Sequence, residues 1–519
     1  MFKVKIFKTK IFNAKIFKTM CLMAFILLVA AGCAFAQGDT LTVIMAADSK
    51  SLDPHAAPDL SSTGVMTQMM ESLVTIDSGG KIVPLLAESF EKLDDLRYKF
   101  VLRRGVKFHN GEELTAGDVK YAFTRAVKTG KVIDYVVRNI DVEHIEILDD
   151  HTIIVPSLTP DSSFLACLSH YCAGVILNQK AVDAAGERVG MQPVGTGPYK
   201  FVSWQKGNRI VLERFDDYWG EKAKTPNLVF RTITEGTNRC IELETGGADI
   251  VQSLLPVDVN RVTDNSKLTL LRVPAPVVMY LGMNVSGEPL SDIRVRRAIT
   301  MVVDNRPIVK IAFRGVGLPA RGPVPPTIKY YDATLPEILP DVEKAKILMA
   351  EAGHKDGLKM ELWCRDEKTY IDTATIIQNQ LKQIGIDISI QVMEWGAFLE
   401  KLKQREQQLY LQAWNSVIAD PDYSLFGVFH SSQKLTGLNR GVYGNLAVDK
   451  LLDDGKRVSD GPEREAIYHQ LQHLIVDDAA WGFLHVNELL IGMRENVRGF
   501  LFDPSGNHKY YQVYFDQAK

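Results

Sequence analysis

Two stretches of this 519-residue sequence gather residues that could recognise a small charged ligand. The first, WCRDEKTY, contains Arg365, whose planar guanidinium can pair with both oxygens of a carboxylate. The second, WNSVIADPDY, combines aromatic, amide and acidic side chains: Trp414, Asn415, Asp420, Asp422 and Tyr423. A carboxylate suits an ammonium group, and aromatic rings offer rigid walls for a ligand backbone. These residue types favour non-covalent recognition.

Each of these candidates has a simpler structural alternative. Arg365 stands beside Asp366 and Glu367 and could be an ordinary exposed arginine. Asp is a favoured turn residue, so Asp420 and Asp422 could cap a turn or remain solvated. Packing in the core or at its rim is the commoner role of tryptophan and tyrosine. The residues alone leave these alternatives open.

Signatures of catalysis are missing from the sequence. There is no GxSxG nucleophile elbow and no HExxH metal helix. The Gly-Thr-Gly-Pro segment at 195–198 precedes a predicted hairpin at 199–215 rather than a helix, which argues against a phosphate-binding loop. The histidines suggest no clustered ligand set. We therefore predict a protein that is not an enzyme and has no cofactor or metal site, with a secreted hydrolase as a remote alternative.

Composition and the N-terminus indicate an exported protein. Charged residues make up 24% of the chain and the net charge is −3, so nucleic acid is not an expected partner. Residues 1–36 combine six lysines, an apolar run and an Ala-Phe-Ala site, which predicts a cleaved signal peptide. In the alternative interpretation, VAAGC is a loose lipoprotein box and Cys33 carries a lipid anchor.

Four cysteines follow the predicted signal peptide: Cys167, Cys172, Cys240 and Cys364. In an oxidising compartment Cys167 and Cys172 could form a disulfide, whereas Cys240 and Cys364 could be buried small side chains. The spacing of the four lacks the second close pair of a zinc site.

Alternating strands and helices must position the two candidate loops. We predict a strand at 40–48, a helix at 115–127 with Thr115 as its cap, and then a regular alternation in the second half. That alternation has helices at 341–353, 369–385 and 395–404 and strands at 358–364, 386–392 and 409–414. Open α/β sheets bind ligands beyond the carboxyl ends of their strands. The loops after 364 and 414 are therefore the expected ligand loops.

Several motifs, in order along the chain, resemble those of one family: SLDPH, PLLAESF, YKFVLRRGVKFHNGEELTAGDVKYAF, VGTGPYKFVSW, DDYWG, RVRRAI and KAKILMAEAG. Together they resemble the solute-binding proteins of peptide, nickel and opine ABC importers. The resemblance implies an α/β fold, a two-lobed periplasmic-binding-protein clamshell with an extra subdomain inserted in the first lobe. It places lobe I at 38–82, 194–283 and 490–519, the extra subdomain at 83–193 and lobe II at 284–489.

The resemblance also implies the function. The protein would be the substrate-binding component of an ABC importer, a periplasmic monomer that captures a short peptide by lobe closure and delivers it to permease subunits in the inner membrane. Segments 277–284 and 488–496 would act as hinges. A nickel chelate, an opine or an oligosaccharide is the alternative cargo. His55 and His109 belong to shared motifs and are interpreted as structural.

Site residues follow from the same resemblance. Peptide binders of the family often place an Asp three residues after a Trp, where it pairs with the amino group of the peptide. Here that position is Val417, and Asp420 or Asp422 could substitute. Arg365 falls where some members have an arginine that grips the carboxylate of the ligand. The spacing looks closest to glutathione-binding members, which favours a short peptide with carboxylates.

Overall fold

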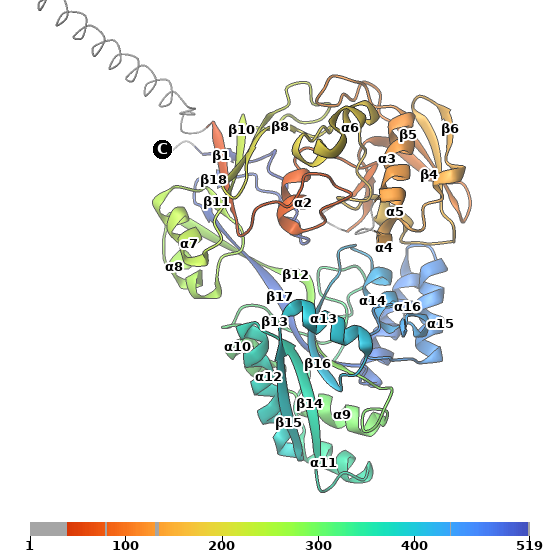
Figure 1. The fold of residues 1–519 in the computed structure, drawn as a ribbon, viewed down its shortest axis with the longest axis vertical. Coiled ribbons are helices and arrows are strands. Elements are labelled where there is room, and N and C mark those ends of the chain that lie inside the picture. Colours follow the sequence, from red (N-terminus) through yellow and green to blue (C-terminus); the bar gives the residue numbers. More distant parts are fainter. Residues whose placement is uncertain (1–38, 78–79, 130–133, 436, 517–519) are drawn as a thin grey trace, which may run out of the picture.

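Two lobes are joined by a pair of long strands, β12 (Leu268–Met283) and β17 (Trp481–Arg494) (Figure 1). The structure is a computed structural model that describes residues 39–77, 80–129, 134–435 and 437–516. The predicted signal peptide, with Cys33, lies outside the described residues. The two-lobed α/β architecture is the one that the resemblance implies.

One sheet runs through both lobes, in the order β15-β14-β16-β12-β17-β11-β1-β10-β9-β8, with β13 (Leu318–Pro319) paired to β17. β12 and β17 pair antiparallel from Leu268 opposite Arg494 to Gly282 opposite Trp481. Their register shifts between Pro274 and Val278. This irregular stretch separates the part of β17 that pairs with β11 from the part of β12 that pairs with β16.

The upper lobe in Figure 1 is built around one edge of the sheet. Its strands are β1 (Thr40–Met45), β8 (Tyr199–Gln205), β9 (Arg209–Arg214), β10 (Asn227–Thr232) and β11 (Ile250–Val251). It also contains the helices α2 (Leu60–Met66), α7 (Gly236–Thr245) and α8 (Val259–Thr263). The predicted hairpin at 199–215 is confirmed, because β8 and β9 are antiparallel neighbours, with β9 ending at Arg214.

The Gly-Thr-Gly turn before this hairpin serves the packing of the upper lobe. A Cβ on Gly195 would lie 2.1 Å from the Met69 carbonyl oxygen, and one on Gly197 would lie 2.7 Å from the carbonyl carbon of the same residue, so only glycine fits. Between them, the Thr196 hydroxyl donates to the buried carboxylate of Glu71 at 2.8 Å. Tyr218 and Trp219 of the DDYWG motif donate to the same carboxylate at 2.7 and 2.9 Å. Two of the family motifs thus meet at one buried group.

The inserted subdomain has its own antiparallel sheet, in the order β4-β5-β7-β6. Its elements are β4 (Ala87–Lys92), β5 (Arg97–Leu102), β6 (Glu146–Asp149), β7 (Thr152–Pro156), α3 (Ala116–Thr129), α4 (Asp134–Val137), α5 (Phe164–Leu168) and α6 (Gln179–Ala185). The predicted helix after Thr115 is present, and Asp118 accepts from the N–H of Thr115 at 3.1 Å and from its hydroxyl at 2.8 Å. This subdomain shares one hydrophobic core with the upper lobe.

The two structural histidines join parts of this shared core. His109 Nε2 lies 3.0 Å from the Gly197 carbonyl oxygen. His55 Nδ1 lies 2.7 Å from a guanidinium nitrogen of Arg125, which also forms two hydrogen bonds with Asp53. Burial lowers the pKa of both imidazoles, to about 3 for His55 and about 4 for His109. Both therefore serve packing in the neutral form.

The lower lobe confirms the alternation predicted for the second half of the chain. Its parallel strands are β14 (Leu358–Arg365), β15 (Ile386–Met393) and β16 (Leu409–Asn415). Its helices are α9 (Ile293–Val302), α10 (Asn305–Ile311), α11 (Val342–Glu351), α12 (Lys368–Leu381), α13 (Trp395–Gln404), α14 (Pro421–Phe429), α15 (Leu446–Arg457) and α16 (Pro462–Asp477). The predicted cap Asp341 accepts from Lys344 N at 3.0 Å, and Gly353 after α11 has φ +86°.

The disulfide that the sequence left open does not form. Cys167, Cys172, Cys240 and Cys364 are all free and buried in the described part of the chain. Cys167 lies in α5 and Cys172 in the turns that follow it. The second alternative, buried small side chains, therefore describes all four cysteines.

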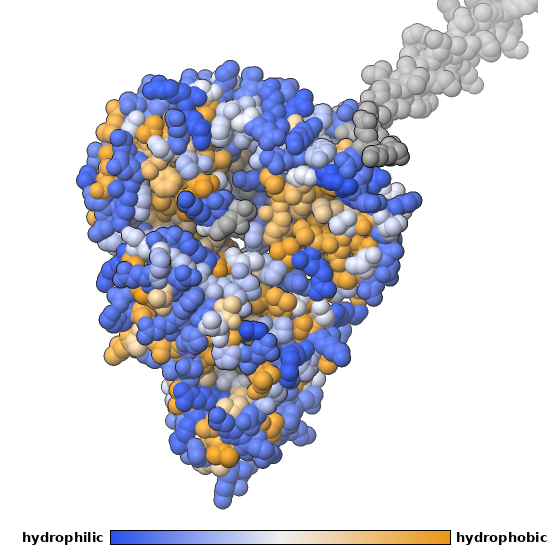
Figure 2. Space-filling view, turned by 180° about the vertical axis from the view of Figure 1, so that it is seen from behind, coloured by the Kyte–Doolittle hydropathy of each residue, from blue (hydrophilic) through white to orange (hydrophobic). Residues whose placement is uncertain are grey.

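Hydrophilic residues cover much of the back face of the molecule, and hydrophobic side chains gather in separate areas rather than in one band (Figure 2). The same view shows a broad upper part and a narrower lower part. Among the described residues, none of the helices has the length and apolar character needed to cross a membrane.

Candidate ligand-binding site

A cavity of about 440 Å³ lies between the inserted subdomain and the lower lobe. Residues 136–167, from α4 to α5, line one side of it, and residues 414–456, from β16 to α15, line the other. Its volume is within the usual range for small-molecule sites. The loop that follows β16 forms part of its wall, as expected for a ligand site beyond the carboxyl end of a strand.

Three of the six predicted residues line this cavity: Trp414, Asp422 and Tyr423. The rings of Trp414 and Tyr423 stack with their centroids 5.8 Å apart. The indole nitrogen of Trp414 is buried and has no hydrogen-bond acceptor among the described residues. A ligand oxygen in the cavity could accept from it, since a buried donor without a partner costs free energy.

Asp422 is the free carboxyl group of this wall. Its side chain is buried, and Oδ1 has no hydrogen-bond partner within the described ranges. Burial, together with the nearby charge of Asp161, raises the pKa of Asp422 to about 7, although Lys456 and Arg464 act in the opposite direction. A cationic ligand group beside Asp422 would favour the ionised form and satisfy the free oxygen.

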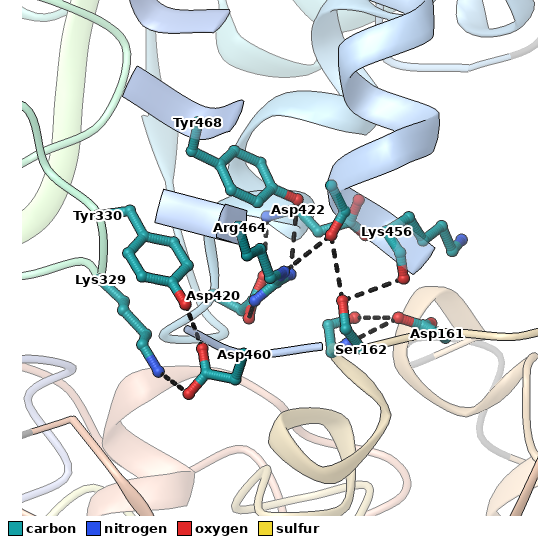
Figure 3. A network of polar contacts seen from close by, with 12 residues as sticks. Asp161, Ser162, Lys329, Tyr330, Asp420, Asp422, Lys456, Asp460, Arg464 and Tyr468 are labelled. Atoms are coloured by element: carbon teal, nitrogen blue, oxygen red, sulfur yellow. Dashed lines mark hydrogen bonds and ion pairs between the residues drawn. The ribbon is translucent and has the colours of Figure 1, made fainter. Parts of the chain in front are cut away.

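Asp420 is already paired. Both of its carboxylate oxygens accept hydrogen bonds from Arg464, at 2.6 and 2.7 Å, and Oδ1 also accepts from Asp422 N at 2.9 Å (Figure 3). The hydrogen bond from Asp422 N makes Asp420 the N-cap of α14. Arg464 is 1% exposed, so the pair is a buried ion pair. The turn-capping alternative considered for the two aspartates therefore describes Asp420.

Both walls of the cavity carry basic and acidic residues. In the part of the chain that the structure describes, the lining contains Arg138, Arg440 and Lys456 together with Asp161 and Asp422. Asp161 is held by three donors: the backbone N–H and the hydroxyl of Ser163, at 2.9 and 2.6 Å, and the Asn139 amide at 3.2 Å. The lining thus suits a ligand that carries both an ammonium group and carboxylates.

Arg365 and Asn415 lie outside this lining. The Arg365 guanidinium lies over the ring of Tyr370, 4.0 Å from its centroid, and forms an ion pair with Glu367. It also lies 5.2 Å from the ring centroid of Trp395. Asn415 is exposed at the end of β16. Arg365 is half-buried rather than fully exposed, and its Nε has no hydrogen-bond partner among the described residues. Its role in binding a carboxylate stays a prediction.

One spacing was overlooked in the sequence. His469 and His473 are four residues apart on α16, a pattern that can bind metals on a helix face. In the structure His473 Nε2 lies 3.1 Å from Asp332 Oδ2, and His469 Nε2 lies 3.9 Å from Glu465 Oε1. Within the described residues, no group of three or more His, Cys, Asp or Glu side chains is arranged to hold a metal ion.

The basic residues of the cavity and the partner of Asp420 were not predicted. Arg138 lies in the inserted subdomain. Arg440 and Lys456 follow α14 in the sequence, and Arg464 lies in the first turn of α16. None of them belongs to a local motif that marks a ligand site. The docking of the subdomain against the lower lobe brings Arg138 to the cavity that Arg440 and Lys456 also line, whereas Arg464 binds Asp420 outside this lining.

Comparison with known proteins identifies the family. Residues 81–436 match the family described as bacterial extracellular solute-binding proteins, family 5. The chain belongs to this family. A similar relative is the glutathione-binding protein GsiB of Salmonella choleraesuis, 30% identical over 485 residues, which are 92% of this chain and 94% of the relative. The dipeptide-binding protein of Escherichia coli is 29% identical over 461 residues, 83% of this chain and 86% of that protein.

A similar solved structure is the ABC transporter-associated periplasmic binding protein DppA from Helicobacter pylori in complex with the peptide STSA. It has a TM-score of 0.76 and 29% identity, and the match covers 92% of this chain and 98% of that one. Both the family and the fold class inferred from the sequence motifs are confirmed.

Proposed function

We propose that this family 5 protein is the substrate-binding component of an ABC importer and captures a short peptide between its lobes. The observation that carries the proposal is Asp422, a buried carboxyl group with a free oxygen in an inter-lobe cavity. Asp422 would pair with the amino group of a bound peptide, a role that an Asp at the position of Val417 has in many peptide binders of the family. The names of the relatives, glutathione-binding and dipeptide-binding protein, support a peptide cargo.

The charges of the lining favour an acidic peptide. Three basic and two acidic residues in the described lining suit a ligand with one negative charge in excess. Glutathione, a γ-linked tripeptide, carries one ammonium and two carboxylates at neutral pH. Asp422 would bind its amino group, and Arg138, Arg440 and Lys456 would bind its carboxylates. The indole N–H of Trp414 would donate to a peptide oxygen.

The domain boundaries belong to the same proposal. Lobe I would comprise 38–82, 194–283 and 490–519, with the subdomain at 83–193 and lobe II at 284–489. The hinges at 277–284 and 488–496 are supported by the shift in register that begins at Pro274, since a break in a strand ladder lets two parts rotate. The mature protein, freed of residues 1–36 or anchored through Cys33, would act as a periplasmic monomer without catalytic activity and would deliver the peptide to inner-membrane permease subunits.

The thermal midpoint of the mature protein tests this proposal, after unfolding and refolding to remove copurified cargo. We expect glutathione to raise the midpoint, because a ligand at a hundred times its Kd stabilises the folded state by about 2.7 kcal/mol. Peptides of two to five residues define the size limit. N-acetylation of a peptide that binds should abolish its shift, since the group that pairs with Asp422 is lost.

Two variants locate the site. Asp422→Asn should remove the midpoint shift, whereas Asp356→Asn, at an exposed aspartate of the lower lobe, should leave it unchanged. If no peptide shifts the wild-type midpoint, the peptide proposal is wrong, and a nickel chelate, an opine or an oligosaccharide becomes the cargo to test. If a peptide binds but Asp422→Asn binds equally well, the assignment of Asp422 is wrong.

A further inference from the structure

Three hydrogen bonds join the inserted subdomain to the lower lobe at a single residue. The backbone N–H of Ser162 donates to the Lys456 carbonyl at 2.9 Å. Its hydroxyl contacts the carbonyl oxygens of Gly455 and Lys456 at 3.1 and 3.0 Å. Ser162 lies just before α5, and its two acceptors lie in the last turn of α15 (Figure 3). The contact therefore crosses the boundary that a lobe movement would open.

This contact lies directly beside the ligand cavity. On the subdomain side, the neighbours of Ser162 in sequence, Asp161 and Ser163, both line the cavity. On the other side Lys456 lines it too. The three hydrogen bonds can form only when these two walls approach each other. They would therefore break if the inserted subdomain and the lower lobe moved apart.

A buried network holds the acceptor of Ser162 in place. The Gly455 carbonyl also accepts a hydrogen bond from Nε of Arg464 at 2.8 Å. The other guanidinium nitrogens of Arg464 bind Asp420, the N-cap of the helix that carries Asp422. A continuous path of hydrogen bonds and one helix end thus connects Ser162 with the free carboxyl group in the cavity.

Packing also fixes the position of this carbonyl. A Cβ on Gly455 would lie 2.9 Å from Cζ of the Tyr468 ring, so the helix end lies close against that ring. Tyr468 is fully buried, and its hydroxyl lies 3.5 Å from Arg464. An acceptor held in this way loses little conformational freedom when the lobes close, so its hydrogen bonds contribute more to the closed state.

We propose that Ser162 is the latch of the closed protein and that Arg464 is a positioning residue, which couples this latch to the helix that carries Asp422. The latch sets how long a peptide stays bound, because its bonds must break before the two walls separate and the peptide leaves. The same bonds favour the approach of the two walls in the absence of a ligand. This inference rests on the proposed function, since it assumes that a peptide is captured by closure.

The dissociation rate of glutathione tests the latch, measured by stopped-flow displacement with the intrinsic tryptophan fluorescence as the signal, to which Trp414 in the cavity wall contributes. Ser162→Ala removes both hydroxyl contacts and should raise koff about tenfold, with kon within about twofold of the wild type. Ser169→Ala is the matched control. Its hydroxyl donates to the Ala166 carbonyl at 2.7 Å within the same subdomain, so koff should not change. Equal koff values for the two variants would overturn the proposal.

A double-mutant cycle tests the role of Arg464. Arg464→Lys keeps the charge but loses the fork that binds Asp420 and Gly455 together. If Arg464 acts by holding the acceptor of Ser162, the two substitutions should not be additive: Ser162→Ala should raise koff by less than threefold in the Arg464→Lys background. Full additivity would contradict the coupling. If Arg464→Lys does not fold, Asp420→Asn takes its place in the cycle.

A measurement without ligand separates the latch from the cargo. Spin labels at Leu148→Cys in β6 and Leu446→Cys in α15 report the distance between subdomain and lower lobe. Both leucines are exposed, 54% and 86%, and the native cysteines of the described residues are buried. Ser162→Ala should shift the distribution to longer distances, and an unchanged distribution would overturn the latch. If wild-type protein binds no peptide, the proposed function fails, and this distance alone decides the latch.

Discussion

At the scale of single residues, two aspartates of one loop have opposite environments. Asp420 is neutralised by Arg464 and caps α14, whereas Asp422, two residues later, faces the cavity with a free oxygen. The difference does not lie in residue type or local sequence. It comes from one buried arginine on another helix. Asp422 is therefore the candidate site residue, because its buried Oδ1 has no hydrogen-bond partner among the described residues.

The raised pKa of Asp422 predicts a pH dependence of peptide binding. The ammonium of the ligand pairs with the ionised carboxylate, and the pKa of the free protein is about 7 at this position. Affinity should therefore be constant above pH 7 and fall by up to tenfold per pH unit below it. Titration calorimetry with glutathione from pH 5.5 to 8.5 measures this.

The Asp422→Asn variant is the control, because its residual affinity should not depend on pH in that range. The facing charges of Asp161 and Lys456 act on Asp422 in opposite directions and remain in both proteins. A wild-type profile as flat as that of the variant would show that Asp422 does not titrate with binding.

At the scale of elements, the family motifs are mostly about packing. Thr196 of the Gly-Thr-Gly turn and the DDYWG motif meet at Glu71, the glycines of the turn pack against Met69, and His109 contacts the Gly197 carbonyl. None of these residues is in the described lining of the cavity. These motifs therefore identify the fold, but they do not indicate which ligand the protein binds. The cargo depends on the loops that the motifs hold.

The close approach of this turn to Met69 predicts a large effect of a small substitution. Gly197→Ala should destabilise the protein by about 1–3 kcal/mol, because the new methyl group overlaps the Met69 backbone. Urea unfolding measures the change. Gly64→Ala, in α2 of the same lobe, has nothing within 4 Å of the new Cβ and should be neutral or stabilising. Equal effects of the two changes would contradict this account.

At the scale of the whole molecule, stability does not depend on a disulfide. The described cysteines are free, and hydrophobic cores in both lobes hold the fold together. A reducing agent should therefore leave the thermal midpoint of the mature protein within about one degree of its value under oxidising conditions. Calorimetry with and without dithiothreitol checks this. A midpoint lowered by several degrees would reveal a bridge between Cys167 and Cys172.

From the sequence we could predict the strand at 40–48, the helix at 115–127, the hairpin after the Gly-Thr-Gly-Pro segment, the alternation of helices and strands from 341 to 414, and the loop after β16 as a candidate ligand loop. These elements follow from local patterns such as apolar periodicity and caps like Asp341. The two-lobed fold was implied instead by the resemblance of several motifs to one family. The three-dimensional contacts were needed to show that Asp420 is paired whereas Asp422 Oδ1 has no partner among the described residues, that Arg365 lies outside the cavity, and that Arg138, Arg440 and Lys456 line it. These features depend on contacts between residues far apart in sequence, such as Asp420 with Arg464 and Ser162 with Gly455. The packing of separate helices and lobes brings such residues together, and local sequence patterns do not predict these contacts.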